Sequence, residues 1–224
     1  MGAEAYRETG LRSLSAILAV GAVLAVLALA GCGGGSSATD TTGSGAEEQQ
    51  VPAGAVAVVS DVPADQGEVT VDELRHAIDQ HAAQQKLSSA PKPGDPTYKK
   101  ISEEALGELL DGVWIEGEAA ELGLVATDRE VEAEAEKIRD QNFKTEAQWH
   151  HFLAESKLTP EDVDRRVKLQ LLSQKIQYEI ENGAAGKAGK QQQFKAFVTA
   201  FQRKWKERTL CRADFVNERC SNAS

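Results

Sequence analysis

Apolar residues recur every three or four positions along most of the chain after residue 70, with charged and polar residues between them. This spacing places the apolar side chains on one face of a helix. The pattern predicts about six helices: 71 to about 86, 98–122, 127 to about 142, one opening at Thr145, 159 to about 182, and a last one that carries the aromatic residues between 194 and 205. The predicted fold class is therefore mainly α.

Three of these helices have recognisable start signals. Thr70 with Glu73, and Thr127 with Glu130, have the spacing of a capping box, in which the Thr and Glu side chains satisfy each other's backbone donors. Thr159 precedes a proline and two acids, which favours a helix start there. Inside the 98–122 helix, Gly117 costs about 1 kcal/mol relative to alanine, so we expect it to permit a close helix contact.

Two short strands are expected before the first helix, at 55–60 and around Val69, because the segments are β-branched and bounded by turn residues. Near the other end, Cys211 and Cys220 are too far apart along a helix to pair, so a disulfide requires the chain to leave the helix near Leu210 and double back. The segment 213–216 could then form a strand beside 55–60. The alternative for the two cysteines is a pair of buried free thiols.

The N-terminus has the pattern of an export signal. Arg7 and Arg12 precede an apolar run from about residue 14 to 30, which ends in Leu-Ala-Gly-Cys. That tetrapeptide resembles the lipobox of bacterial lipoproteins and predicts lipidation at Cys32; a transmembrane anchor is the alternative. The predicted organisation is a signal peptide at 1–31, a flexible tether at 32–50 and a helical domain at 51–224, anchored outside the cytosol at the cell membrane.

The charge distribution excludes some functions. The formal net charge is −10, which argues against nucleic-acid binding. Residues 51–186 hold 14 basic and 27 acidic side chains, whereas residues 187–224 hold 9 basic and 3 acidic ones, so the basic end has an acidic body to pack against. The four histidines lack metal-site spacing, and we expect neither a metal nor a cofactor.

Several segments resemble the chaperone domain of exported SurA/PrsA-type peptidyl-prolyl isomerases. They are the strand Val56-Ala57-Val58-Val59, the run ALGELLDGVWIEGEAAELGLVATDREVEAEAEKIR (105–139) and the run QNFKTEAQWHHFLAESKLTPEDVDRRVKLQLLSQKI (141–176). The resemblance implies a helical module that cradles unfolded or partly folded exported proteins. Members commonly carry a parvulin isomerase domain before the last helix, but here about a dozen residues (183–193) fill that position. We therefore expect no enzyme activity.

The candidate client-binding residues are aromatic. Four of them lie at helical spacing near the C-terminus, where they form either the last part of the core or the lining of a groove. The full set is Trp114, Trp149, Phe152, Phe194, Phe197, Phe201 and Trp205. The expected function is a membrane-anchored holdase for unfolded exported polypeptides; the alternatives are an adaptor for one dedicated envelope partner and a protein with residual isomerase activity.

Overall fold

The computed structural model describes residues 50–63, 66–182 and 185–223. The predicted signal peptide, the lipidation site at Cys32 and all but the last residue of the predicted tether lie outside this range. Among the helices that the structure does describe, none combines the length and the apolar character needed to cross a bilayer.

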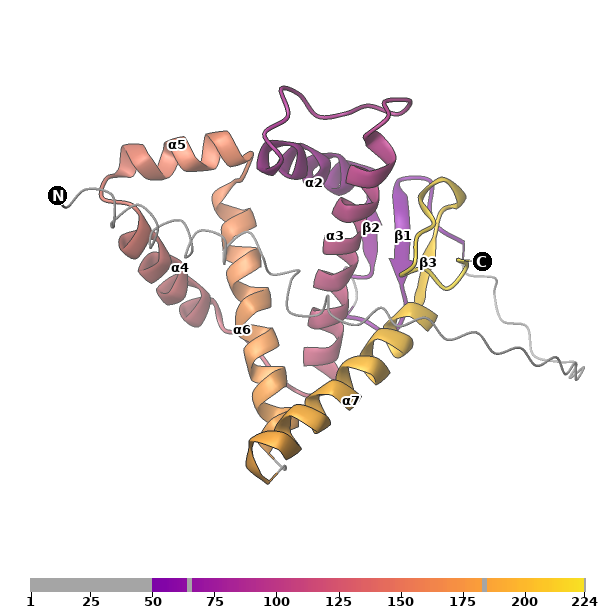
Figure 1. The fold of residues 1–224 in the computed structure, drawn as a ribbon, viewed down its shortest axis with the longest axis vertical. Helices are drawn as coiled ribbons and strands as arrows, with labels where there is room; N and C mark the ends of the chain where they lie inside the picture. Colours follow the sequence, from indigo (N-terminus) through magenta and orange to yellow (C-terminus); the bar gives the residue numbers. More distant parts are fainter. Residues whose placement is uncertain (1–49, 64–65, 183–184, 224) are drawn as a thin grey trace, which may run out of the picture.

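Six α-helices and three short strands make up the described chain, so the fold is mainly α, as predicted (Figure 1). In chain order the elements are β1 (Ala55–Val59), β2 (Glu68–Thr70), α2 (Val71–Gln84), α3 (Tyr98–Glu121), α4 (Asp128–Asn142), α5 (Glu146–Ser156), α6 (Pro160–Asn182), α7 (Gly186–Glu207), β3 (Thr209–Cys211) and the 3-10 turn η1 (Ala213–Phe215).

The predicted caps form and set where the helices begin. The Thr70 hydroxyl accepts a hydrogen bond from the Glu73 amide at 3.1 Å, and the Glu73 carboxylate accepts one from the Thr70 amide at 2.8 Å. Thr127 starts α4 with the same reciprocal pair. At α6 the Thr159 hydroxyl accepts from the Asp162 amide at 3.1 Å. These helix starts are fixed by local interactions, which is why they could be read from the sequence.

The three strands form an antiparallel sheet in the order β2-β1-β3, so β3 joins the end of the domain to its beginning. The predicted position of the last strand is wrong: it lies at 209–211, and residues 213–215 form η1 instead. The chain leaves α7 before Leu210, so Cys211 already pairs with Ala57 in the sheet. η1 then begins the return to Cys220, which forms the predicted disulfide with a Cα–Cα distance of 5.7 Å.

The last helix is longer than predicted. Residues 182–189 were expected to be a flexible connector, but α7 begins at Gly186. The alanine, lysine and glutamine residues that follow have high helix propensity, and they extend the helix upstream of its aromatic face despite Gly189. α7 runs from the C-terminal end of α6 to β3, and its polar N-terminal turns are largely exposed (Figure 1).

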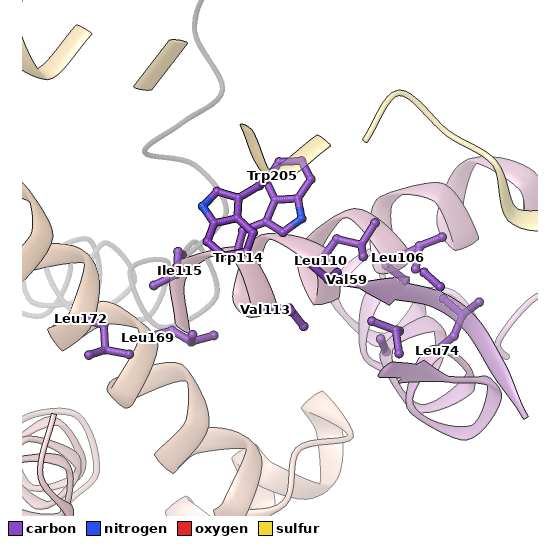
Figure 2. Close-up of a cluster of buried hydrophobic side chains, with 14 of the residues drawn as sticks. Val59, Leu74, Leu106, Leu110, Val113, Trp114, Ile115, Leu169, Leu172 and Trp205 are labelled. Atoms are coloured by element: carbon purple, nitrogen blue, oxygen red, sulfur yellow. The ribbon is translucent and has the colours of Figure 1, made fainter. Parts of the chain in front are cut away.

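The hydrophobic core is organised around α3, which lies between the sheet and α6 (Figure 2). Buried α3 side chains pack toward Val59 and Leu74 on one side and toward Leu169 and Leu172 of α6 on the other. The α3 side chains in this core include Leu106, Leu110, Val113, Trp114 and Ile115. A helix buried on two sides gives the domain a central element against which α6 and α7 both dock.

Gly117 allows α7 to approach α3 closely, as predicted. A Cβ atom at this position would lie 2.3 Å from Cη2 of Trp205, whose side chain is fully buried. No real Cβ tolerates that distance, and the opposing atom belongs to a rigid indole.

Replacing Gly117 with alanine should therefore lower the free energy of unfolding by about 1–3 kcal/mol, the usual range for overpacking. The effect runs against helix propensity, which favours alanine by about 1 kcal/mol. Urea unfolding followed by circular dichroism measures it. Gly54→Ala is the control, because a Cβ there meets no atom within 4 Å. An increase in stability for Gly117→Ala would show that the α3–α7 contact is looser than described.

Candidate binding cleft

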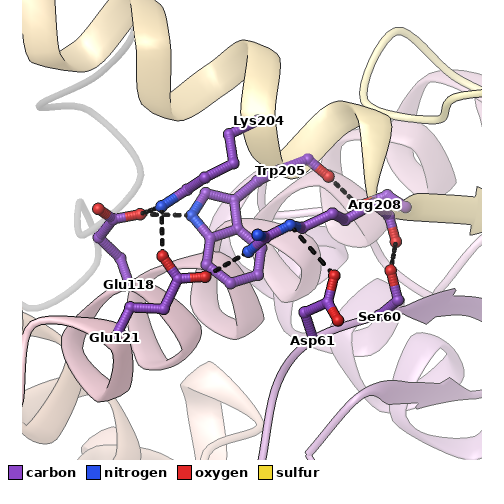
Figure 3. Close-up of polar contacts among 8 residues, drawn as sticks. Ser60, Asp61, Glu118, Glu121, Lys204, Trp205 and Arg208 are labelled. Atoms are coloured by element: carbon purple, nitrogen blue, oxygen red, sulfur yellow. Dashed lines mark hydrogen bonds and ion pairs between the residues drawn. The ribbon is translucent and has the colours of Figure 1, made fainter.

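A set of charged contacts fastens the basic end of the chain to the acidic end of α3 (Figure 3). The Trp205 indole donates a hydrogen bond to the Glu118 carboxylate at 2.7 Å. Lys204 pairs with both Glu118 and Glu121, and Arg208 pairs with Glu121. The two cations also lie over the Trp205 ring, at 5.0 Å and 4.9 Å from its centroid. The charge asymmetry of the sequence thus corresponds to a real docking contact.

Three of the seven predicted client-binding aromatics belong to the core. Trp114, Phe201 and Trp205 are 3%, 4% and 0% exposed. The Trp114 indole donates a hydrogen bond to the Thr209 hydroxyl at 2.9 Å, which ties α3 to β3. These rings close the space between α3, α7 and the sheet, so a client cannot reach them in this structure.

The other four aromatics are half-buried and form two separate groups. Phe194 and Phe197 stack on α7 with ring centroids 6.3 Å apart. Trp149 and Phe152 stack on α5 at 5.8 Å, and Phe143 from the end of α4 packs against both. The predicted set is therefore not brought together at one site.

The structure contains a cleft of about 780 Å³ that is lined by α3, α4, α6, Trp149 of α5, and the segment around β2. α6 lies between α3 and α4 (Figure 1). Of the seven predicted aromatics only Trp149 lines this cleft. A volume of this size is typical of a ligand-binding pocket, and the elements that line it belong to the packed body of the domain.

The apolar lining of the cleft consists mainly of small aliphatic side chains: Val69, Leu109, Val113, Val131, Ala135 and Val163. Sequence reasoning assigned the α4 residues in this set to a narrow core seam. The missed signal was the shortness of that seam: valine and alanine on a helix that is otherwise charged cannot fill the space towards α3 and α6. Short side chains thus create the cleft, and the large aromatics lie mostly elsewhere.

Acidic side chains surround the apolar lining. Seven acidic and three basic residues line the cleft. One acid, Glu116, accounts for two of the bases, because Lys168 lies 2.8 Å and Arg165 lies 3.9 Å from its carboxylate. The remaining acidic residues are Glu68, Glu73, Asp128, Glu132, Glu136 and Asp164. The cleft therefore combines an apolar surface with an excess of negative charge.

A family model of the SurA-like N-terminal domain matches residues 5–177, which is most of the chain and includes every residue that lines the cleft. The chain belongs to the SurA-like N-terminal domain family. Searches of curated proteins and of solved structures returned no match. The family range ends within α6, so the docking contact made by α7 lies outside it.

The resemblance inferred from the sequence is thereby confirmed, together with the departure from it. Asn182 ends α6 and Gly186 begins α7, so three residues occupy the position at which related proteins carry a parvulin domain. Even small domains need about 50 residues. This SurA-like chain has no room for an isomerase domain at that point.

The α4 wall of the SurA-like domain is tied to α6 at its N-terminal end. Lys175 of α6 donates to the Glu130 carboxylate at 2.7 Å and to the Val125 carbonyl at 2.6 Å. The hydrogen bond from Lys175, followed by those from Thr127, lowers the pKa of Glu130 to about 2. This contact holds one end of α4 at a fixed position relative to α6 and leaves the cleft side of α4 available.

A buried polar network joins α2, α3 and α6 behind the cleft. Arg166, only 7% exposed, donates to Gln80 at 2.7 Å and pairs with Glu108 at 3.1 Å. Glu108 also lies 2.9 Å from His81, and Asp162 lies 2.8 Å from a ring nitrogen of His76. Within the described residues, no three histidine, cysteine or acidic side chains are grouped in a way that could hold a metal ion.

This network should make the SurA-like domain acid-sensitive. Burial alone raises the pKa of Glu108, but the hydrogen bond from His81 and the charge of Arg166 outweigh it, and the pKa is lowered. The pKa of Asp162 is lowered as well, because hydrogen bonds from Thr159 and His76 outweigh its burial. A carboxylate with a lowered pKa stabilises the fold above its unfolded pKa, and this contribution is lost as the pH falls through the folded pKa.

The free energy of unfolding should therefore decrease as the pH is lowered from about 5 to 3, where unfolded carboxylates titrate. Asp111 opposes the trend, because burial raises its pKa despite its hydrogen bonds with Arg219. Urea unfolding at a series of pH values measures the slope, and Glu108→Gln should make it shallower. Constant stability from pH 7 to pH 3 would contradict this interpretation of the network.

Proposed function

We propose that this protein is a membrane-anchored chaperone that holds unfolded exported polypeptides in the cleft and has no isomerase activity of its own. The observation that carries the proposal is the cleft itself. It is open, its surface is largely apolar, and all its lining residues lie in the part of the chain that matches the SurA-like family.

The cleft can bind without chemistry. An extended client segment would place apolar side chains against residues such as Leu109 and Trp149, which are both half-buried and line the cleft. The driving force is the apolar area removed from water, about 25 cal/mol per Å². Such binding is non-directional, so it tolerates many sequences and is readily reversible, which suits a protein that delays aggregation.

The N-terminal segment supports a location outside the cytosol. A lipid on Cys32 would attach the chain to the membrane, and the Gly-, Ser- and Thr-rich residues up to 50 would serve as a tether. The disulfide between Cys211 and Cys220 agrees with an oxidising compartment. In this arrangement the cleft meets polypeptides as they emerge at the outer face of the membrane.

The proposal is tested with the full-length protein in nanodiscs of zwitterionic lipid, with empty nanodiscs as the control. Light scattering of a chemically unfolded client should fall as the protein approaches equimolar amounts. A proline-peptide isomerisation assay run in parallel should stay at the background rate. No suppression of aggregation at a several-fold molar excess would refute the holdase function, and recovery of one stoichiometric partner on crosslinking in cells would favour an adaptor instead.

A further inference from the structure

We infer that the cleft selects client segments in which lysine or arginine residues flank apolar ones. The inference deepens the proposed function and rests on it. It starts from the acidic residues of the cleft, which come from different walls. Glu68 belongs to β2, Glu132 and Glu136 to α4, and Asp164 to α6.

None of these four carboxylates forms an ion pair with any residue in the described part of the chain. All four side chains belong to exposed residues. Glu132 and Glu136 are one helical turn apart, so they present two like charges on the same side of α4. Solvated acids that face an apolar surface are available to a ligand without breaking an existing interaction.

The basic residues of the cleft, by contrast, already have partners. Lys168 and Arg165 lie 2.8 Å and 3.9 Å from Glu116, and Arg139 lies 3.5 Å from Glu146 outside the cleft. The excess charge available to a ligand is therefore negative. A concave site with apolar walls concentrates such a field and attracts ligands of opposite charge.

Lysine and arginine have the side-chain form that this surface accommodates. Their aliphatic stems can lie along Val131 and Ala135 while their charged ends reach Glu132 or Glu136 on the same helix. A segment that carries glutamate at the same positions would instead meet like charge. The apolar lining thus provides general affinity, and the acids provide discrimination.

The discrimination should be moderate and sensitive to salt. Single exposed ion pairs contribute little, but three or four in one site add up to a difference of about tenfold in Kd between a basic and an acidic segment. Screening shortens the range of these interactions to about 3 Å at 1 M salt, so the difference should then largely disappear.

The test uses three labelled peptides with the same apolar residues and with lysine, serine or glutamate at every polar position. Fluorescence anisotropy measures their binding to the full-length protein in zwitterionic nanodiscs at low and high salt. The double variant Glu132→Gln, Glu136→Gln removes two cleft charges. Glu155→Gln, Glu179→Gln is the matched control, because both acids are exposed on helices and neither lines the cleft.

The lysine peptide should bind the wild type about tenfold more tightly than the glutamate peptide. The cleft variant should lose most of this ratio, and the control variant should keep it. Equal binding of all three peptides by the wild type would overturn charge selection while leaving the holdase function intact. Binding of none would remove both proposals. A change in oligomeric state for the cleft variant alone would assign the acids to self-association and also overturn the inference.

Discussion

Replacing Trp205 with alanine should lower the free energy of unfolding by about 3–5 kcal/mol, the cost typical of removing a buried aromatic side chain. Trp205 is fully buried, packs directly against Gly117, and donates a hydrogen bond to Glu118. Its loss would leave both a cavity and a buried carboxylate with one partner fewer. Urea unfolding monitored by far-ultraviolet circular dichroism measures the change without depending on tryptophan fluorescence.

Tyr178→Ala is the control for this prediction. Tyr178 is also a large aromatic residue on a helix, but it is 70% exposed, so the change in stability should stay within about 0.5 kcal/mol. Trp205→Phe should fall between the two, since it keeps much of the packing and removes the hydrogen bond. Similar stabilities for Trp205→Ala and the wild type would show that α7 does not contribute to the cooperative core.

The double variant Leu109→Gln, Trp149→Gln should lose most of its ability to suppress client aggregation. Both side chains line the cleft and are half-buried, so each leaves apolar surface for a client and neither is a fully packed core residue. Losing about 100 Å² of apolar contact reduces the binding free energy by about 2.5 kcal/mol, which corresponds to a more than tenfold weaker Kd. The aggregation assay should need a correspondingly higher concentration of protein.

The matched control is Leu87→Gln, Tyr178→Gln, which removes one aliphatic and one aromatic side chain that are exposed outside the cleft. It should behave as the wild type does. Circular dichroism establishes that both double variants remain folded. If the control loses activity and the cleft variant keeps it, clients bind to the outer surface of the domain instead of the cleft.

Local patterns predicted the helices well, because the interactions that start a helix lie within one turn of sequence. The capping residues Thr70, Thr127 and Thr159 each begin a helix at the predicted place. The position of β3 depends instead on where the chain leaves α7 and reaches the edge of β1, which is a long-range property. The sequence therefore predicted that the two ends of the domain pair, but placed the strand several residues too late.

The cleft could not be located from the sequence because it is a space between helices. Large aromatic residues such as Trp114 and Trp205 attracted attention, and they are in fact used to pack α3 against α7. Valine and alanine at positions 131 and 135 leave a gap that depends on how far α4 stands from α3. No local pattern encodes that separation, although a short apolar seam on a charged helix is consistent with it.

Site-specific photo-crosslinking tests the central claim most directly, namely that unfolded clients occupy the cleft between α3, α4 and α6. A photo-reactive residue replaces Ala135 in the cleft or, as the control, Glu179 on the exposed surface of α6. The full-length protein is then irradiated with an unfolded client and with the same client in its native state. Position 135 should crosslink to the unfolded client alone, and position 179 to neither. The account is contradicted if position 135 yields no crosslink, or if both positions crosslink equally.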